Sequence, residues 1–174
     1  MNIETTATAT KTDVKNHHGG KFLSFFLKQE EYGIEILKVQ EIIGILPITR
    51  VPRTPEFVKG VINLRGKIIP VTDLRSKFGM EEREETTETC IIVVQTNGLE
   101  IGVIVDKVSE VLDITDKEIE DVPTFGTDVS TDYLLGIGNT NGRVRLLLDI
   151  ERILTAQEVV QMQEITATSE AFAG

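Results

Sequence analysis

Few residues in this chain could carry enzyme chemistry. Both histidines, His17 and His18, lie in a polar N-terminal stretch, which leaves no imidazole elsewhere to act as a general base. Cys90, the only cysteine, heads an apolar strand, where we expect a buried thiol rather than a nucleophile. Asp73 and Asp149 precede short helical patterns, and helix capping accounts for both. The sequence therefore predicts no catalytic site, no metal site and no cofactor.

Composition predicts a soluble globular protein. The 174 residues suffice for one ordinary domain or for two very small ones that share a core. The charged side chains, 18 basic and 28 acidic, give a net charge of -10, which disfavours nucleic acid as a partner. No apolar run approaches the roughly 20 residues of a membrane span, so we expect no direct membrane insertion. A single cysteine and an N-terminus without an apolar stretch favour a cytoplasmic location.

Alternating apolar residues, interrupted by turn residues, predict a chain made mainly of strands. Hairpins are expected at three dipeptides: Arg65-Gly66, Asn97-Gly98 and Asn141-Gly142. Helical segments are predicted over 56–59, 73–79 and 149–165, whereas 39–45 fits either a helical turn or a strand. The acidic segment 80–88 is expected to connect two halves of the chain.

The two halves repeat one another. Equivalent residues 69 positions apart include Gly33 and Gly102, Lys38 and Lys107, Val39 and Val108, Glu41 and Glu110, and Ile42 and Val111. A second set, 76 positions apart, includes Asn63 and Asn139, Gly66 and Gly142, and Asp73 and Asp149. Each half is too small to be stable alone, so the repeat predicts a mainly all-β fold of two five-stranded barrels with a shared core. We expect barrels over roughly 20–85 and 88–155, a disordered tail over 1–19, and a helix end and tail over 156–174. The C-terminal helix could pack on the first barrel.

Three side chains are candidates for a role beyond folding. Arg65 stands at a hairpin tip where turn geometry does not require an arginine, so it is either a solvated charge or an interface anchor. Glu41 is a candidate ion-pair partner for Arg65. Phe125 lies in a polar loop, where an aromatic ring either inserts into the core or binds a partner.

Several runs of the chain resemble the CheW family of bacterial chemotaxis coupling proteins. These runs are EEYGIEILKVQEI, TPEFVKGVINLRGKIIPVTDLRSKFG, LEIGVIVDKVSEVL and YLLGIGNTNGRVRLLLDIERIL, within about residues 20–155. The resemblance implies two SH3-like barrels around a continuous core. It also implies a non-enzymatic adaptor that couples methyl-accepting chemoreceptors to the histidine kinase CheA in signalling arrays at the inner face of the membrane.

The resemblance assigns roles to particular residues. It implies that the cytoplasmic tip of the receptor binds at Val39, Glu41, Ile42, Asn63, Leu64, Arg65, Gly66, Val108 and Val111. It implies that the regulatory domain of the kinase contacts Phe125. A monomer is expected in isolation.

Other functions stay open at this stage. A module of the same fold could be the regulatory domain of a kinase or part of another two-component protein. A small ligand-binding barrel could use Asp73, Asp106 and Asp149. An oligonucleotide-binding barrel is disfavoured because the chain is acidic and has no basic aromatic face.

Overall fold

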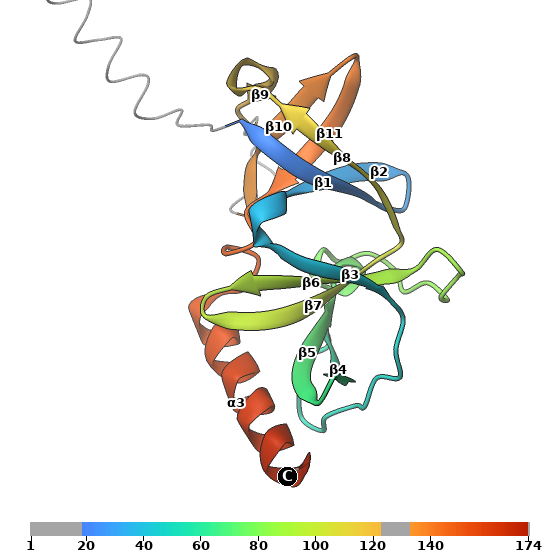
Figure 1. Cartoon of the computed structure of the whole chain (residues 1–174), viewed down its shortest axis with the longest axis vertical. Helices are drawn as coiled ribbons and strands as arrows, with labels where there is room; N and C mark the ends of the chain where they lie inside the picture. The colour runs from blue at the N-terminus through green and yellow to red at the C-terminus, as the bar shows by residue number, and fades with distance from the viewer. Residues whose placement is uncertain (1–18, 123–132, 174) are drawn as a thin grey trace, which may run out of the picture.

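The protein consists mainly of strands arranged in two sheets. The structure is a computed structural model that describes residues 19–122 and 133–173. The upper sheet of Figure 1 has the strand order β8-β1-β2-β11-β10-β9, and the lower sheet has the order β3-β6-β7-β5-β4. The strands are β1 (Gly20–Leu27), β2 (Glu30–Glu35), β3 (Val39–Gly44), β4 (Val58–Leu64), β5 (Lys67–Asp73), β6 (Cys90–Thr96), β7 (Leu99–Val105), β8 (Lys107–Ile114), β9 (Ile119–Glu120), β10 (Leu134–Thr140) and β11 (Arg143–Leu148). The helices are η1 (Ile36–Lys38), α2 (Leu74–Lys77), η2 (Asp116–Glu118) and α3 (Ala156–Ala173). The predicted all-β class with two SH3-like subdomains is confirmed.

The two halves of the repeat exchange their first two strands. The lower sheet combines β3, β4 and β5 of the first half with β6 and β7, the first two strands of the second half. The upper sheet combines β8, β9, β10 and β11 of the second half with β1 and β2, the first two strands of the first half. This happens because β2 runs through η1 into β3, and β7 runs past Asp106 into β8, so each of these pairs spans both sheets. The predicted boundaries, 20–85 and 88–155, therefore do not separate the two sheets. Turn signals are local, whereas strand exchange depends on pairing between residues far apart in the sequence.

Three hydrophobic clusters fill this arrangement. A large central cluster combines upper-sheet residues such as Phe25 and Ile34 with lower-sheet residues such as Ile92 and Val103. A smaller cluster lies within each barrel, around Phe22 and Leu147 in one and around Ile91, Val93 and Ile69 in the other. Side-chain alternation explains the division, because successive residues of β6 point to opposite faces. The predicted shared core is the central cluster.

Three hairpins form at the predicted dipeptides. They join β4 to β5, β6 to β7 and β10 to β11. Both central residues of each turn have positive φ: 53° and 85° at Arg65-Gly66, 53° and 74° at Asn97-Gly98, and 52° and 76° at Asn141-Gly142. These angles belong to type I′ turns, whose twist matches that of the flanking strands.

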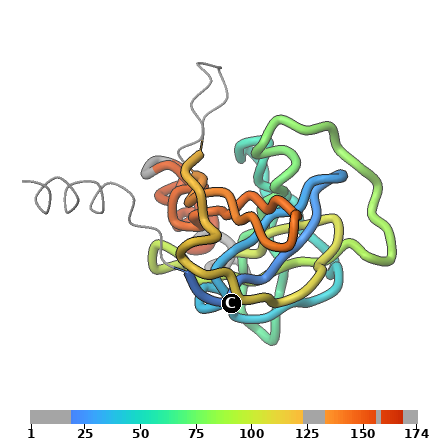
Figure 2. The backbone as a smooth tube through the Cα atoms, turned by 90° about the horizontal axis from the view of Figure 1, so that it is seen from above, coloured from blue at the N-terminus to red at the C-terminus, as the bar shows by residue number. Residues whose placement is uncertain are grey.

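The structure decides the remaining local predictions. Residues 39–45 resolve as the strand β3, and no helix forms over 56–59, because β4 already begins at Val58. The acidic segment 80–88 does connect α2 to β6, and Figure 2 shows it in green, projecting from the body of the molecule.

The C-terminal helix begins later than predicted and extends further. Asp149 caps a turn rather than a helix, since its carboxylate accepts a hydrogen bond from the Glu151 amide. The helix α3 starts after Thr155, whose side chain and that of Glu158 form a reciprocal capping box. It continues over residues expected to be a tail, and it packs against β5, with Met162 and Ile165 in the central cluster.

Candidate functional site

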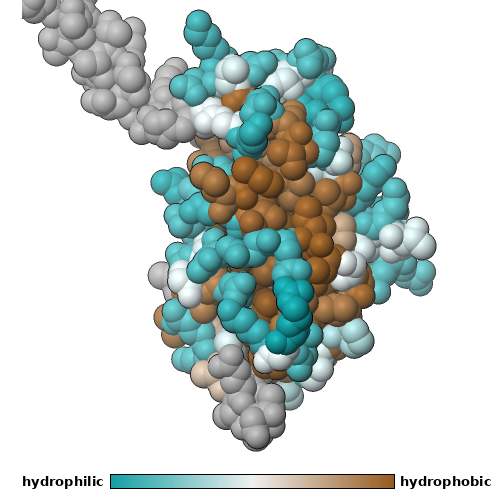
Figure 3. Space-filling model, in the orientation of Figure 1, coloured by the Kyte–Doolittle hydropathy of each residue, from teal (hydrophilic) through white to brown (hydrophobic). Residues whose placement is uncertain are grey.

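Two pseudo-equivalent edge strands carry most of the predicted receptor residues. Strand β3 is an outer strand of the lower sheet, and β8 is an outer strand of the upper sheet. Val39 of β3 and Val108 of β8 are half-buried and pack against the central cluster. Ile42 and Val111, which are equivalent in the repeat, are 44% and 50% exposed. Figure 3 shows hydrophobic side chains gathered across the middle of this face, where the two sheets meet.

The hairpin between β4 and β5 brings Arg65 to β3. Thr49, beyond the end of β3, pairs with Val61 of β4 through two backbone hydrogen bonds of 2.8 Å, which closes this side of the barrel. The Arg65 guanidinium donates a hydrogen bond to the Glu41 carboxylate. This bond raises the pKa of Arg65 above its ordinary value. The candidate ion pair is therefore present, and it holds an exposed guanidinium against β3.

The rest of the hairpin tip supports this geometry. The Asn63 Oδ1 accepts a hydrogen bond of 2.8 Å from the backbone amide of Gly66. Leu64 is half-buried against the cluster inside the lower barrel. We refer to the following residues as the junction surface: Val39, Glu41, Ile42, Asn63, Leu64, Arg65, Gly66, Val108 and Val111. Phe125, the predicted kinase contact, lies outside the described residues.

The equivalent hairpin of the other barrel differs in its chemistry. The Asn139 side-chain amide donates a hydrogen bond to the Glu120 carboxylate, whereas the equivalent Asn63 accepts one from the glycine of its turn. Turn geometry therefore explains the asparagine only in the first half of the repeat. Arg145 takes the place of the apolar Ile69 and forms a buried ion pair with Glu31, with 2.8 Å between Nε and Oε2. Burial raises the pKa of Glu31, but hydrogen bonds and charge from Arg145 outweigh burial and leave this pKa below its ordinary value.

Leu37 is an exposed residue that sequence reasoning missed. It lies in η1, two residues before Val39, and its side chain is 92% exposed. In the repeat it is equivalent to Asp106, 69 positions later, so one copy places a leucine where the other places a carboxylate. That difference between the copies was the available signal.

The carboxylates considered for a ligand-binding barrel do not form one site. Asp73 caps α2 by accepting from the Arg75 amide at 3.0 Å, and burial raises its pKa. Asp106 pairs with the guanidinium of Arg75, and Asp149 pairs with Arg152. Over residues 19–122 and 133–173, no group of histidine, cysteine and carboxylate side chains could hold a metal ion.

Cys90 is half-buried against the central cluster, in agreement with a structural role for the thiol. Burial raises the pKa of this thiol, which makes it a weaker nucleophile at neutral pH. None of the helices in the described part of the chain is long and apolar enough to cross a membrane.

Two interlocked barrels with an apolar surface at their junction define a protein-interaction module. Comparison with known families and proteins specifies the class further. The model of the CheW-like domain family matches residues 21–158, and the chain therefore belongs to the CheW-like family. As a member of this family it is a non-enzymatic chemotaxis adaptor.

Individual relatives agree with this assignment. The chain is 43% identical to a chemotaxis protein CheW of Klebsiella aerogenes over 147 residues, which cover 84% of this chain and 89% of that protein. It is 36% identical to the chemotaxis protein CheW of Thermotoga maritima over 132 residues, which cover 76% and 85% of the two chains. The crystal structure of the scaffolding protein TtCheW from Thermoanaerobacter tengcongensis superimposes with a TM-score of 0.74 at 37% identity, and covers 80% of this chain and 95% of that one.

Proposed function

We propose that this adaptor binds the cytoplasmic tip of a chemoreceptor on the junction surface and the regulatory domain of the kinase CheA elsewhere. In this way it couples the two within arrays at the inner face of the membrane. The observation that carries the proposal is the pair of exposed apolar residues, Ile42 and Val111, on the edge strands of the two sheets. Arg65 adds a charge that Glu41, the neighbour of Ile42 in β3, holds in position.

The junction surface suits a helical partner. An amphipathic helix buries its apolar face between apolar walls, and charged side chains at the rim fix its orientation. Here Val39 and Val108 supply half-buried walls, while Leu37 extends the apolar surface along η1. Signalling contacts of this kind bury modest areas, and a few anchor residues carry most of the binding free energy. We propose Ile42, Val111 and Leu37 as these anchors.

The kinase contact is proposed at Phe125, on the basis of the family resemblance. Separate sites let one chain hold receptor and kinase together, as an adaptor requires. Phe125→Ala should lower affinity for the kinase regulatory domain, measured by calorimetry, and leave receptor binding unchanged. Unchanged kinase affinity would remove Phe125 from the proposed site.

The receptor site is tested with two variants, each of which places a carboxylate at an exposed apolar position. One position lies on the junction surface and the other lies outside it. Ile42→Asp should weaken binding of a receptor cytoplasmic fragment by about tenfold or more, because a desolvated carboxylate replaces an apolar anchor. Val160→Asp is the matched control, since Val160 of α3 is 50% exposed and lies outside the junction surface. Calorimetric titration gives both affinities, and thermal unfolding shows whether each variant is folded. Equal affinities for the wild type and Ile42→Asp would contradict the proposed receptor site.

A further inference from the structure

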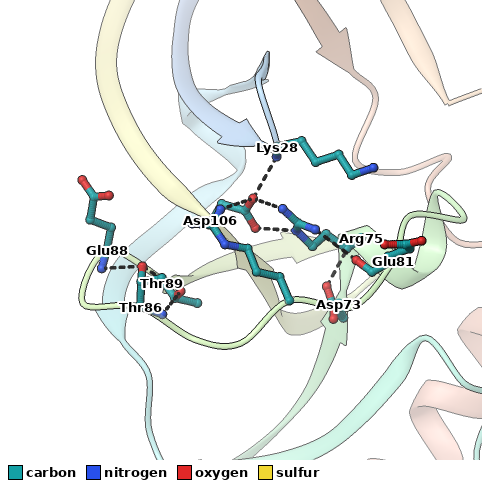
Figure 4. A network of polar contacts seen from close by, with 9 residues as sticks. Lys28, Asp73, Arg75, Glu81, Thr86, Glu88, Thr89 and Asp106 are labelled. Carbon is teal, nitrogen blue, oxygen red and sulfur yellow. Dashed lines mark hydrogen bonds and ion pairs between the residues drawn. The ribbon is translucent and has the colours of Figure 1, made fainter.

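Asp106 lies where the chain passes from the lower sheet to the upper sheet, and both oxygens of its carboxylate accept hydrogen bonds (Figure 4). It accepts two hydrogen bonds from Arg75 of α2, with Nε–Oδ1 at 2.8 Å and Nη2–Oδ2 at 2.6 Å. It also accepts from the backbone amide of Lys28, in the β1–β2 turn, at 2.8 Å, and from Arg83 at 3.2 Å. The Asp106 amide donates to the carbonyl oxygen of Phe26 in β1. One side chain thus joins α2 beside the lower sheet to the β1–β2 hairpin of the upper sheet.

The pair between Asp106 and Arg75 is almost completely withdrawn from water. The two side chains are 12% and 8% exposed. Burial raises the pKa of Asp106, but the hydrogen bonds from Arg75 and Lys28 outweigh burial and leave this pKa below its ordinary value. A buried ion pair is often no more stabilising than an apolar pair of the same size, so its presence needs a reason other than stability.

The other copy of the repeat forms the same crossing without this pair. Leu37 takes the place of Asp106, and Glu151 takes the place of Arg75, 76 positions later. Leu37 is exposed, and the Glu151 carboxylate accepts from Lys38 at 2.9 Å instead. A crossing between the two sheets can therefore form without a buried pair of aspartate and arginine. It is specific to the crossing from β7 into β8.

Along the chain, the ion pair adjoins segments that carry two parts of the junction surface. Strand β8, with Val108 and Val111, starts directly after Asp106. Arg75 belongs to α2, which follows β5 and the hairpin that carries Arg65. The Asp106–Arg75 contact therefore ties the start of β8 to the helix that follows the hairpin of Arg65.

We propose that Asp106 and Arg75 are positioning residues that hold the two barrels in the relative orientation that the receptor site needs. The inference rests on the proposed receptor site. It adds that the orientation of the barrels, and not only the surface residues, sets receptor affinity. The bidentate geometry suits this role because it fixes direction as well as distance.

The test separates orientation from stability by comparing two buried ion pairs. Asp106→Asn and Glu31→Gln each remove the charge of a buried carboxylate that accepts from an arginine, but Glu31 and Arg145 both lie within the upper sheet. Both variants should lower the melting temperature. Only Asp106→Asn should weaken binding of the receptor fragment, by about fivefold, and the effect of Glu31→Gln should stay within a factor of two.

An apolar replacement of the whole pair completes the test. The double variant Asp106→Leu/Arg75→Met should recover much of the lost melting temperature but not the lost receptor affinity. It should also exchange the amide hydrogens of residues 107–112 faster than the wild type does. Recovery of affinity together with stability, or equal loss of affinity in Glu31→Gln, would overturn the proposal.

Failure of the proposed function gives a different result. In that case the wild-type chain itself does not bind the receptor fragment. Hydrogen exchange over 107–112 then decides the structural part of the inference, because it needs no partner. Unchanged exchange in both Asp106 variants would show that the pair does not hold β8 in place.

Discussion

Arg65 occupies a backbone position that arginine does not favour. Its φ of 53° is in the left-handed region, where asparagine and glycine are tolerated best, and the other two type I′ turns described above place asparagine there. The hairpin would therefore form at least as well without the arginine. Its side chain is exposed and held by Glu41, which fits a residue kept for a contact outside the chain.

Arg65→Asn should separate binding from folding. Because asparagine adopts the left-handed conformation with little strain, the melting temperature should stay the same or rise slightly. Receptor-fragment affinity should fall, measured by calorimetry. The reverse exchange at the equivalent turn, Asn141→Arg, should cost about 1 kcal/mol of unfolding free energy. A large loss of stability in Arg65→Asn would show that Arg65 is structural.

Glu31 links stability to pH. Its pKa is lower in the folded state than in the unfolded state, where it is near the ordinary value of 4.5. Its contribution to the free energy of unfolding is therefore fully present above the unfolded pKa, and is lost as the pH falls through the lower folded pKa. Asp106 and Glu158 also have lowered pKa values and act in the same direction. Asp73, whose pKa burial raises, opposes them.

The free energy of unfolding should therefore decrease as the pH falls from about 5 to about 3. In Glu31→Gln the decrease should be smaller, since glutamine cannot take up that proton. Urea unfolding at a series of pH values measures both slopes. Identical slopes for the two proteins would mean that Glu31 does not contribute.

At the scale of elements, two glycines allow the parallel strand pairs that join the halves. Gly33 faces Leu147 where β2 pairs with β11, and Gly102 faces Val71 where β7 pairs with β5. A Cβ atom on Gly102 would lie 2.8 Å from a methyl carbon of Ile91 and 3.2 Å from one of Val71. The repeat thus keeps glycine at this position in both halves for close packing.

Gly102→Ala should lower the free energy of unfolding by about 1–3 kcal/mol, because the added methyl group overpacks the strand contact. Gly44→Ala is the control, since nothing lies within 4 Å of the added Cβ atom at that strand position. Urea unfolding of the two variants provides the comparison. An equal effect at both positions would show that packing against Ile91 is not the cause.

Elements with local signals could be predicted from the sequence, and their assembly could not. The dipeptides Asn97-Gly98 and Asn141-Gly142 fix their hairpins, because type I′ turns depend on the turn residues alone. The capping box at Thr155 marks the start of α3, but reading Asp149 as a helix cap favoured an earlier start. The exposure of Leu37 follows from tertiary packing, which no short pattern encodes.

The same limit applies to the candidate site. The sequence offered Glu41 as a candidate partner for Arg65, but only the structure shows that the two side chains pair. The partnership of Asp106 and Arg75 was not, because it depends on where β7 crosses between the sheets. The repeat identified the equivalent residues but not the exchange of strands between the barrels.

On the scale of the whole molecule, strand exchange makes the two halves interdependent. Each barrel takes two strands from the other half, and the central cluster draws on both sheets. Neither half can therefore complete a barrel by itself. This interlocking supports a rigid adaptor, because the barrels cannot separate without loss of strand pairing.

Cutting the chain within 80–88 should show this interdependence. The fragments 1–85 and 86–174 should each be unfolded alone, and a mixture of the two should regain the β-sheet circular dichroism and the cooperative unfolding of the intact chain. The connection is exposed and lies outside the strands, so its cleavage should lower the stability of the reassembled protein only slightly. A cooperatively folded single fragment would contradict strand exchange.

The most direct measurement concerns simultaneous binding. The chain, saturated with the regulatory domain of CheA, is titrated with a receptor cytoplasmic fragment, and sedimentation gives the mass of the product. Separate sites predict a ternary complex with one copy of each component, and a receptor affinity no weaker than that of the free chain. Displacement of the kinase domain by the receptor fragment, or no binding of either one, would contradict an adaptor that holds both.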